Sequence, residues 1–310
     1  MSAPTTVLVT GATGCVGRAV VAAAERRGWR VRGLARHRPP APWPDAVEVV
    51  AGDVRDRGAV ARAAAGCAAI VHLAGWVHRV PRTAADLAEL RTSIVDGTAV
   101  VADQAARAGA HLVLTSSVAV DDATPYGRAK RDAERRARAA CPDAVVLRPV
   151  VVYGPHDRGN VARLIALIER RLGFVVGDGG NRKSIVYVDN LADRIVATVG
   201  RRDLAGAWVV ADDPAPTQHE LLGAIAGALG RRPPRALPRA PTLAVAGVVD
   251  RLIGSRFRER VAKLAQSTES PGFALDSALG YAPRVAWPQT MRTTVAWRQR
   301  HRQAHRWTSP

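Results

Sequence analysis

Short apolar runs alternate with helix-like segments through the first half of the chain. The first run covers 6–10 and leads into a glycine-rich turn, and an alanine-rich helix is expected over 16–27. Runs that are apolar at every position are typical of strands that helices cover on both faces. Further strands are expected at 29–35, 47–51, 68–73, 111–116 and 144–152, and further helices at 56–65, 93–108 and 126–140. The alternation predicts an α/β protein with a doubly wound parallel sheet of the Rossmann type.

The pattern changes after Gly154, where loops rich in Gly, Asp and Arg surround a helix expected at 160–172. The stretch 230–242 carries too many prolines for regular structure. A strand is expected at 184–188 and a helix at 189–199, and they resume the alternation of strands and helices of the first half. We therefore expect two domains with these bounds: a dinucleotide-binding domain over 1–154 and 184–206, and a smaller C-terminal substrate-binding lobe over 155–183 and 207–310.

The composition of the chain excludes several classes of protein but does not indicate a function. No apolar run reaches the roughly 18–20 residues that span a bilayer, and no basic segment precedes an apolar one at the N-terminus. We therefore expect a cytoplasmic protein without a membrane partner. Cys15, Cys67 and Cys141 are far apart and form no CxxC pair, so the sequence supports neither a metal site nor a disulfide framework.

The net charge of +18 at first suggests a nucleic-acid partner. Only three of the 45 lysine and arginine residues are lysines, and the arginines are spread along the whole chain. No helix-turn-helix, zinc-finger or aromatic-basic stacking motif accompanies them. We expect no nucleic-acid partner, although a basic surface attracts ligands that carry phosphate.

The glycine-rich turn TGATGCVG at 10–17 lies between the first strand and the first helix. Glycines permit the tight turn and let backbone N–H groups approach a pyrophosphate at the helix N-terminus. The spacing GxxGxxG differs from the more common GxGxxG, and such a turn can also simply close a βα unit. Its position directly after a buried strand favours dinucleotide binding, with expected contacts from Gly11, Thr13, Gly14, Cys15, Val16 and Gly17.

Arginines occupy the end of the second strand, where an NAD site carries a carboxylate for the ribose 2′-hydroxyl. Arg36 and Arg38 stand there, and the next acidic residue is Asp45. A planar guanidinium pairs well with a 2′-phosphate. Although arginine is abundant throughout the chain, the missing acid favours NADP(H) over NAD(H). After the third strand, Asp53 is expected to meet the adenine amino group, beside Val54.

Tyr126 and Lys130 form a YxxxK motif on a predicted helix. Residues four apart share one face, so the ammonium can lie near the phenol and lower its pKa toward neutrality. The motif is common by chance, and an ordinary surface helix is the alternative. The hydroxyl-rich end of the fifth strand, with Ser117, and the rarity of lysine here favour the catalytic interpretation. We therefore expect Ser117, Tyr126 and Lys130 to be catalytic.

These motifs together resemble the extended short-chain dehydrogenase/reductase family, most of whose members act on nucleotide-sugars. The matching segments are TGATGCVG at 10–17, GDV at 52–54, HLAG at 72–75, TSS at 115–117, YGRAK at 126–130, LRPVVVYGP at 147–155 and SIVYVDNLAD at 184–193. The resemblance implies that Ser117 polarises the substrate oxygen and that Tyr126 transfers the proton. It also implies that Lys130 holds the nicotinamide ribose.

The resemblance implies further contacts. The cofactor would also meet Leu73, Ala74 and Gly75, and the segment 148–151, with Pro149, would line the nicotinamide. Asn160 and Val161 would meet the substrate diphosphate, and 173–176, with Val175, would run along the nucleobase. Because pairing of two helices between subunits is frequent in the family, it also implies a homodimer.

Two departures from the family pattern bear on the substrate. Lys183, preceded by Arg182, stands where the family usually places an arginine for the diphosphate. We expect both residues to bind substrate, with the bidentate grip moved to Arg182. Ile94 replaces an asparagine near the active site, which removes one polar contact.

The residues also separate the reactions of the family. Val118-Ala119 follows Ser117 where a dehydratase needs an Asp-Glu pair, and Ala35 replaces the strand-two aspartate typical of the epimerases. The leading interpretation is NADPH-dependent reduction of a 4-keto hexose linked to UDP or dTDP. Epimerisation at C4 is the alternative. A non-catalytic module that senses NADP is a third interpretation, which the intact Ser117, Tyr126 and Lys130 argue against.

Overall fold

A computed structural model describes residues 5–36, 47–76, 81–253, 261–262 and 265–307. Internal contacts divide the chain into two units with these bounds: the first unit is 1–150, 188–210 and 272–282, and the second unit is 151–187, 211–271 and 283–310. The sequence analysis instead placed the first boundary at 154 and the return of the chain at 184.

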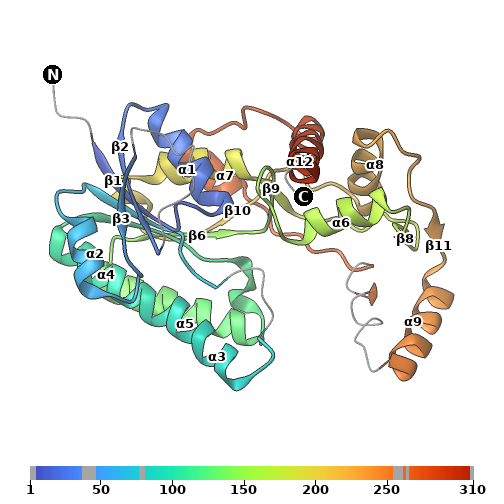
Figure 1. Cartoon of the computed structure of the whole chain (residues 1–310), viewed down its shortest axis with the longest axis horizontal. Helices are drawn as coiled ribbons and strands as arrows, with labels where there is room; N and C mark the ends of the chain where they lie inside the picture. The colour runs from blue at the N-terminus through green and yellow to red at the C-terminus, as the bar shows by residue number, and fades with distance from the viewer. Residues whose placement is uncertain (1–4, 37–46, 77–80, 254–260, 263–264, 308–310) are drawn as a thin grey trace. The chain divides into compact units, whose positions relative to one another are not determined.

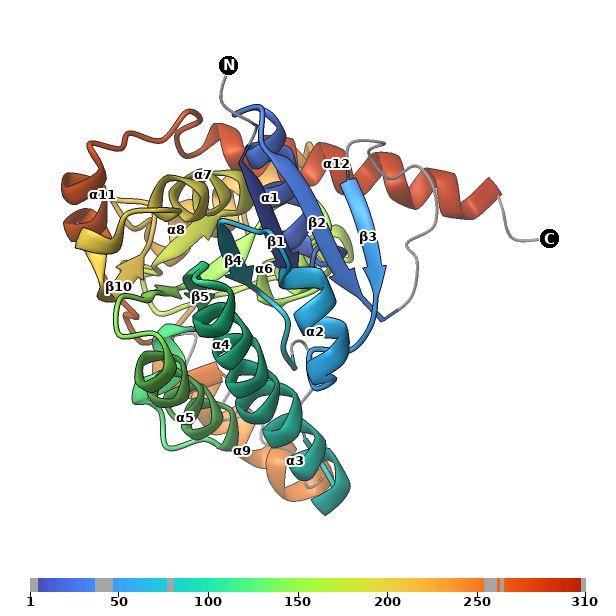
Figure 2. The ribbon, with the colours of Figure 1, turned by 90° about the vertical axis from the view of Figure 1, so that its left-hand side faces the viewer.

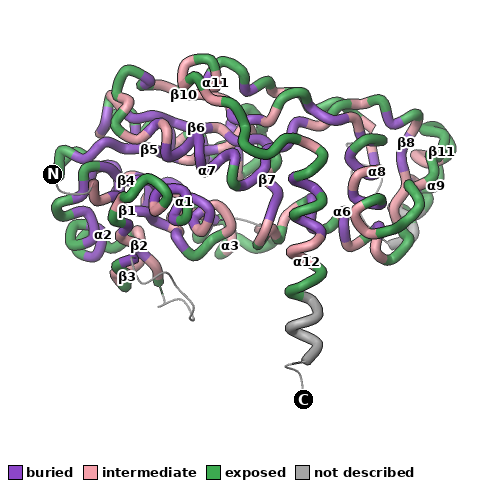
Figure 3. The backbone as a smooth tube through the Cα atoms, turned by 90° about the horizontal axis from the view of Figure 1, so that it is seen from above, coloured by how far each residue is buried: buried purple, intermediate pink, exposed green. Residues whose placement is uncertain are grey.

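A parallel sheet forms the centre of the first unit. Its spatial order is β10 (Gly206–Val210), β6 (Val145–Pro149), β5 (His111–Thr115), β4 (Ala69–His72), β1 (Thr6–Thr10), β2 (Arg30–Ala35) and β3 (Val47–Ala51). Buried residues run along β1, β4, β5 and β6 (Figure 3). The order reverses direction at β1 and β4, and ligands of open α/β sheets bind at such a reversal.

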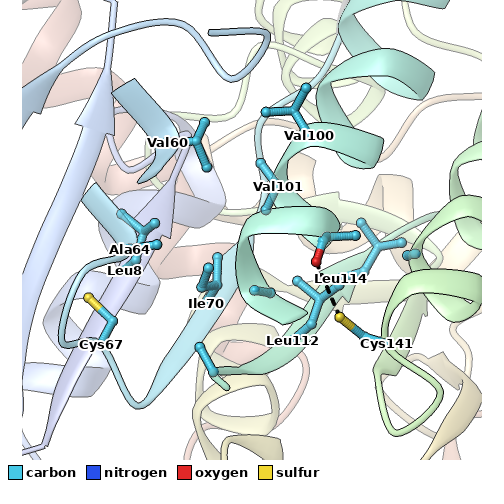
Figure 4. Close-up of a cluster of buried hydrophobic side chains, with 14 of the residues drawn as sticks. Leu8, Val60, Ala64, Cys67, Ile70, Val100, Val101, Leu112, Leu114 and Cys141 are labelled. Carbon is cyan, nitrogen blue, oxygen red and sulfur yellow. Dashed lines mark hydrogen bonds between the residues drawn. The ribbon is translucent and has the colours of Figure 1, made fainter. Parts of the chain in front are cut away.

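Helices cover both faces of this sheet, which confirms the predicted doubly wound fold. One face carries α1 (Cys15–Glu25) and α7 (Val188–Thr198), which pack on each other (Figure 1). The other face carries α2 (Arg57–Ala64), α4 (Gly97–Ala108) and α5 (Pro125–Ala140) (Figure 2). Leu8, Ile70, Leu112 and Leu114 of the sheet meet Val60, Val101 and Cys141 in a buried cluster on this second face (Figure 4).

Shorter elements complete the first unit. They are α3 (Ala84–Arg91), the π-helical turn η1 (Thr92–Asp96), the 3₁₀ turns η2 (Val118–Asp121) and η3 (Arg202–Leu204), and α11 (Phe273–Leu279). The predicted helix over 93–108 thus begins as a π-helical turn that continues α3. A capping box at Thr83, with Asp86 at the third helical position, starts α3.

The predicted strand over 144–152 divides after Pro149. The Val150 N–H donates to the Val210 carbonyl at 3.1 Å, and the chain then enters β7 (Val151–Tyr153). In the second unit β7 pairs with β9 (Ile185–Tyr187). Valines on both sides of Arg148-Pro149 concealed this change of sheet, because hydrophobicity alone does not mark where one buried strand gives way to another.

The second unit is mainly helical. Its helices are α6 (Asn160–Glu169), α8 (Gln218–Ala228), α9 (Arg239–Ile253) and α12 (Gln289–Trp307). Its other strand pair is β8 (Val175–Val176) with β11 (Ala236–Leu237). The expectation of no regular structure over 230–242 was wrong, because its prolines flank a two-residue strand and the first turn of α9, where proline is tolerated. Within the described residues, no helix is both long and apolar enough to cross a membrane.

Candidate active site

The glycine-rich turn leaves the start of α1 open to a ligand. Gly11 has a φ of +69°, and a Cβ there would lie 2.9 Å from the amide nitrogen of Ala74, so only glycine fits. Gly14 precedes α1 without a capping side chain, and the first turn contains no acidic residue. The first N–H groups of α1 therefore fit the pyrophosphate of a dinucleotide.

A cavity of about 340 Å³ lies beside this turn, within the first unit. The expected cofactor residues that line it are Gly11, Thr13, Gly14, Arg36, Asp53, Val54, Leu73, Ala74 and Gly75. Sequence reasoning missed the others, which are Leu34, Ala35, Gly52, Trp76, Glu89 and Ser93. Glu89 and Ser93 gave no sequence signal, because α3 and the π-helical turn were not foreseen. The expected contacts absent from the lining are Cys15, Val16, Gly17, Lys130 and Pro149.

The end of the cavity formed by β2 is cationic. Arg36 is exposed and lines the cavity directly after Ala35. Arg38 lies outside the described residues. Asp53 accepts hydrogen bonds from Nε and Nη2 of Arg55, each at 2.8 Å, and this guanidinium lowers the pKa of the Asp53 carboxyl. The carboxylate expected to meet the adenine is thus already paired with Arg55, which sequence reasoning did not identify.

A buried histidine organises the loop after β4. Thr98 donates its hydroxyl hydrogen to the Ile94 carbonyl, so it accepts from Nε2 of His72, 3.1 Å away. Nδ1 of His72 then accepts from the Thr10 hydroxyl at 2.7 Å. The Thr10 oxygen in turn accepts from the amides of Leu73 and Ala74. Burial lowers the pKa of His72 to about 3, so a neutral imidazole holds this wall of the cavity.

The residues that begin α5 allow this helix to approach the segment after β5 closely. Thr124 caps the helix by accepting from the Gly127 N–H at 3.1 Å, and Pro125 occupies the first turn. A Cβ on Gly127 would lie 2.3 Å from the Ala119 carbonyl oxygen, so glycine permits the close approach of the two segments. The approach brings Tyr126 close enough to Ser117 for this serine to lower the pKa of the phenol.

The titration of Tyr126 differs from our expectation. Lys130 was expected to lower the pKa of the phenol, but burial raises it, and the hydrogen bond with Ser117 only opposes that rise. A buried phenol with a raised pKa holds its proton at neutral pH. It is therefore set to donate a proton rather than to accept one.

Lys130 lies between the tyrosine and the cavity. Its Nζ donates to the Thr115 carbonyl at 3.1 Å and lies 5.9 Å from the centroid of the Tyr126 ring. A Cβ on Gly75, in the cavity wall, would lie 4.0 Å from the same Nζ. Burial lowers the pKa of Lys130 to about 8, and Glu134 opposes this shift. The ammonium thus lies near the Tyr126 ring and near Gly75 of the cavity wall, although Lys130 does not line the cavity itself.

Glu134 also fixes the helix to the sheet. Arg148 of β6 donates to both of its carboxylate oxygens, at 3.0 and 2.6 Å, and this pairing raises the pKa of Arg148. The segment containing Arg148 was expected to line the nicotinamide. Its guanidinium instead binds α5, and Glu134, four residues after Lys130, is a positioning residue that the same helical spacing could have identified.

An apolar cluster lies behind Tyr126. Tyr126 packs against a buried group made of Trp76, Leu90, Ile94, Val95, Ala129 and Ala133. Trp76 is only 6% exposed, although it also lines the cavity. Ile94 belongs to this group at the position where the family pattern has a polar asparagine. The wall beside Tyr126 is therefore apolar.

The substrate residues expected at α6 lie in the second unit. Asn160 is exposed at the first position of α6, and Val161 is buried behind it. The Asp157 carboxylate accepts from the amides of Gly159, at 2.5 Å, and Ala162, at 3.1 Å. A carboxylate thus occupies N–H groups that a diphosphate would use at this helix start.

Arg182 and Lys183, which were expected to bind the substrate, donate hydrogen bonds to backbone carbonyls of the second unit. Arg182 donates from Nη1 to the Ala215 carbonyl at 2.7 Å, and Lys183 donates from Nζ to the Gln266 carbonyl. Burial lowers the pKa of Lys183. Val175 is buried in β8. The structure therefore gives these residues structural contacts, and their contact with a substrate stays a prediction.

Comparison with known proteins agrees with this geometry. The model of the NAD dependent epimerase/dehydratase family matches residues 7–211. A ceramide reductase of Caulobacter vibrioides is 36% identical over 62% of this chain and 60% of its own length. A UDP-glucose 4-epimerase of Vibrio cholerae is 26% identical over 74% of this chain and 77% of its own. The solved structure of MoeE5 with UDP-glucose and NAD shares the fold, with a TM-score of 0.73, 23% identity and coverage of 96% and 99%.

Proposed function

We propose, from the premise that this chain belongs to the NAD dependent epimerase/dehydratase family, that it reduces a carbonyl group with NADPH and with Tyr126 as proton donor. One observation carries the proposal. Burial raises the pKa of the Tyr126 phenol and Ser117 opposes that rise, while the Lys130 ammonium lies near the Tyr126 ring and near Gly75 of the cavity wall. A protonated phenol at the edge of a dinucleotide cavity suits reduction.

Each residue then has a distinct role. NADPH, when bound, supplies the hydride to the carbonyl carbon. Ser117 donates a hydrogen bond to the carbonyl oxygen and steadies its developing charge. Tyr126 delivers the proton to that oxygen, and Lys130 favours the phenolate that remains. Glu134 keeps Lys130 in place from the next turn of α5.

Arg36 underlies the proposed preference for NADPH. It lines the cavity at the end of β2, and Ala35 stands in the position of the acid that would select NAD. The neighbouring carboxylate of Asp53 is paired with Arg55. An exposed guanidinium at this point favours a 2′-phosphate.

The first candidate substrate is a 4-keto hexose linked to UDP or dTDP. Its support is the pair Arg182 and Lys183, at the diphosphate position of the family pattern, and the similarity to a UDP-glucose 4-epimerase. Both side chains would have to exchange a bond to a backbone carbonyl for one to phosphate. A charge-assisted bond to phosphate is stronger than a bond to a neutral carbonyl, so this exchange is favourable.

The second candidate substrate is a ketone with a long apolar chain. The observation that favours it is the apolar wall of Trp76 and Ile94 against Tyr126. Asp157, at the start of α6, also opposes an anionic group there. The similarity to a ceramide reductase agrees with this candidate.

Steady-state kinetics distinguish the two candidates. NADPH oxidation is followed with a UDP-4-keto-hexose and with a long-chain 3-oxo compound, and UDP alone is tested as an inhibitor. The first candidate predicts a higher kcat/KM for the sugar and competitive inhibition by UDP. The second predicts a higher kcat/KM for the 3-oxo compound and no inhibition by UDP. NADPH binding without oxidation in both assays would contradict the proposed function.

A further inference from the structure

Helix α9 (Figure 1) belongs to the second unit, and its two faces differ in exposure. Its inner face, with Leu243 and Ala246, packs against Val176 of β8 and Val261. Ala246 is 1% exposed, so this contact anchors the helix. The helix is therefore held to its unit by one side only.

The outer face is apolar and exposed. Pro241, Ala244, Val245 and Val248 are all exposed and follow the i, i+3, i+4, i+7 spacing of a single helical stripe. Val245 is 63% exposed and Val248 is 52% exposed. Leu237, just before the helix, extends the stripe with 39% exposure. We call these five residues the α9 stripe. Such an apolar stripe on a helix surface needs a partner to cover it.

Arginines lie before the α9 stripe in the sequence and at its end. Arg251 ends it, at the next position of the same face, and four more exposed arginines precede the helix or begin it: Arg231, Arg232, Arg235 and Arg239. Asp250 is the only acidic residue in the described part of 230–253. An exposed apolar stripe bordered by guanidinium groups is the pattern of helices that lie in a membrane interface, where arginines meet lipid phosphates.

We propose that the α9 stripe binds the surface of a membrane that contains anionic phospholipids. The valines would enter the boundary between headgroups and acyl chains, and the arginines would pair with phosphates. A helix in the interface plane does not span the bilayer, so this mode agrees with the lack of a spanning segment in the described residues. It revises our expectation that the chain has no membrane partner.

Other occupants of the stripe fit its chemistry less well. A second copy of this chain would bring arginine borders against each other, and like charges repel across an interface. A nucleic acid would pair with the arginines but leave the valines in water. A lipid surface satisfies both the charge and the apolar area. This inference rests on α9 alone and does not depend on the reaction that Tyr126 performs.

Sedimentation with vesicles tests the proposal on the full chain. One set of vesicles contains phosphatidylcholine and phosphatidylglycerol, and the other contains phosphatidylcholine alone. We expect binding to the first set only. The double variant Val245→Asp/Val248→Asp should bind at least tenfold more weakly, because two carboxylates replace the apolar contact. Arg235→Gln/Arg239→Gln should weaken binding about 25-fold, since each arginine near an anionic surface contributes about fivefold.

Matched variants separate this surface from general charge and hydrophobicity. Leu172→Asp alters a leucine that is 60% exposed outside α9, and Arg136→Gln/Arg138→Gln removes two exposed arginines of α5. Both should bind vesicles within about twofold of the wild type, as expected for surfaces that do not meet the lipid. All variants should retain the wild-type Tm and affinity for NADPH.

Four results would overturn the proposal. The first is vesicle binding that the two aspartates leave unchanged. The second is an equal loss of vesicle binding in the control variant Arg136→Gln/Arg138→Gln, which would mean that net charge alone drives binding. The third is failure to bind vesicles together with self-association that Val245→Asp/Val248→Asp abolishes, which would assign the stripe to a second copy. The fourth is a large fall in Tm for that variant, which would show that the stripe packs within the chain.

Discussion

Two parts of the molecule differ in whether their polar groups already have hydrogen-bond partners. One is the cavity of the first unit, and the other is the loop of the second unit that carries Arg182 and Lys183, here called the cationic loop. In the cavity, the start of α1 has no capping side chain, and Arg36 is exposed at the end of β2. In the loop, Arg182 and Lys183 donate to backbone carbonyls. Asp157 likewise takes the amides at the start of α6.

The cavity residues bear on the reaction, and the residues of the cationic loop bear on the substrate. An exposed group that lines the cavity is available to a ligand, and its residue type indicates the ligand's chemistry. A group that already binds its own backbone has a structural role that any ligand must displace. The reaction is therefore better supported than the substrate, and the following predictions test each side of the comparison.

The largest effect is expected from Tyr126→Phe. Phenylalanine keeps the ring in the apolar cluster but removes the proton donor, so kcat should fall by about 10²–10⁴-fold. The Tm and the NADPH dissociation constant should change little, because the hydroxyl is outside the cavity lining. Fluorescence titration checks NADPH binding, and NADPH oxidation checks turnover. Wild-type turnover in a folded, NADPH-binding variant would remove Tyr126 from the mechanism.

The next effect concerns the cationic end of the cavity. Arg36→Ala should weaken NADPH binding by about 1.5–3 kcal/mol, the value of a charge-assisted hydrogen bond. NADH affinity should stay the same, since NADH lacks the 2′-phosphate. Arg57→Ala, which alters another exposed arginine, serves as the control. Equal affinity of the wild type for NADPH and NADH would contradict the proposed preference.

The burial of His72, in the wall of the cavity, predicts that the free energy of unfolding depends on pH. His72 has a pKa of about 3 in the folded chain, whereas an unfolded histidine titrates near 6.5. Below pH 6.5 the unfolded chain binds a proton that the folded chain excludes, so stability falls as the pH falls. Between pH 6.5 and 5 the loss should reach about 2 kcal/mol relative to His72→Gln. Denaturant unfolding of both proteins checks this.

A parallel pH profile of the wild type and His72→Gln would show that the imidazole is not excluded from protonation. His111, whose pKa burial also lowers, is present in both proteins, so its titration cancels in the comparison.

The smallest effect concerns the cationic loop. If the first candidate substrate is right, Arg182→Ala should raise KM for a UDP-linked sugar about tenfold, since one charge-assisted bond is worth about that factor. NADPH affinity and kcat should change little, because Arg182 does not line the cavity. An unchanged KM for every UDP- or dTDP-linked sugar would assign Arg182 a purely structural role.

Sequence reasoning succeeded where function depends on residues close together in the chain. The strands at 6–10 and 47–51 have the predicted bounds, and the glycine-rich turn and Arg36 lie at one cavity as expected. Lys130 reaches Tyr126 because four residues make about one helical turn.

Features that depend on tertiary contacts could not be read in the same way. The pKa of Tyr126 rises because of burial, which no spacing reports. Thr10, His72 and Thr98 form one network although they are far apart in the sequence. Helix α9 lay partly in a proline-rich stretch, and its exposed valines became apparent only once the inner face was known. The homodimer and the cytoplasmic location stay predictions.

Transfer of a labelled hydride tests the central claim most directly. NADPH that carries deuterium at the transferred position is supplied with each candidate ketone, and the product alcohol is analysed by mass spectrometry. We predict one deuterium in the product for each NADPH oxidised, with NADP released. An epimerised product without net oxidation, or NAD retained on the purified chain, would instead identify an epimerase. Binding of NADPH without any transfer would favour a sensor of NADP and contradict the account.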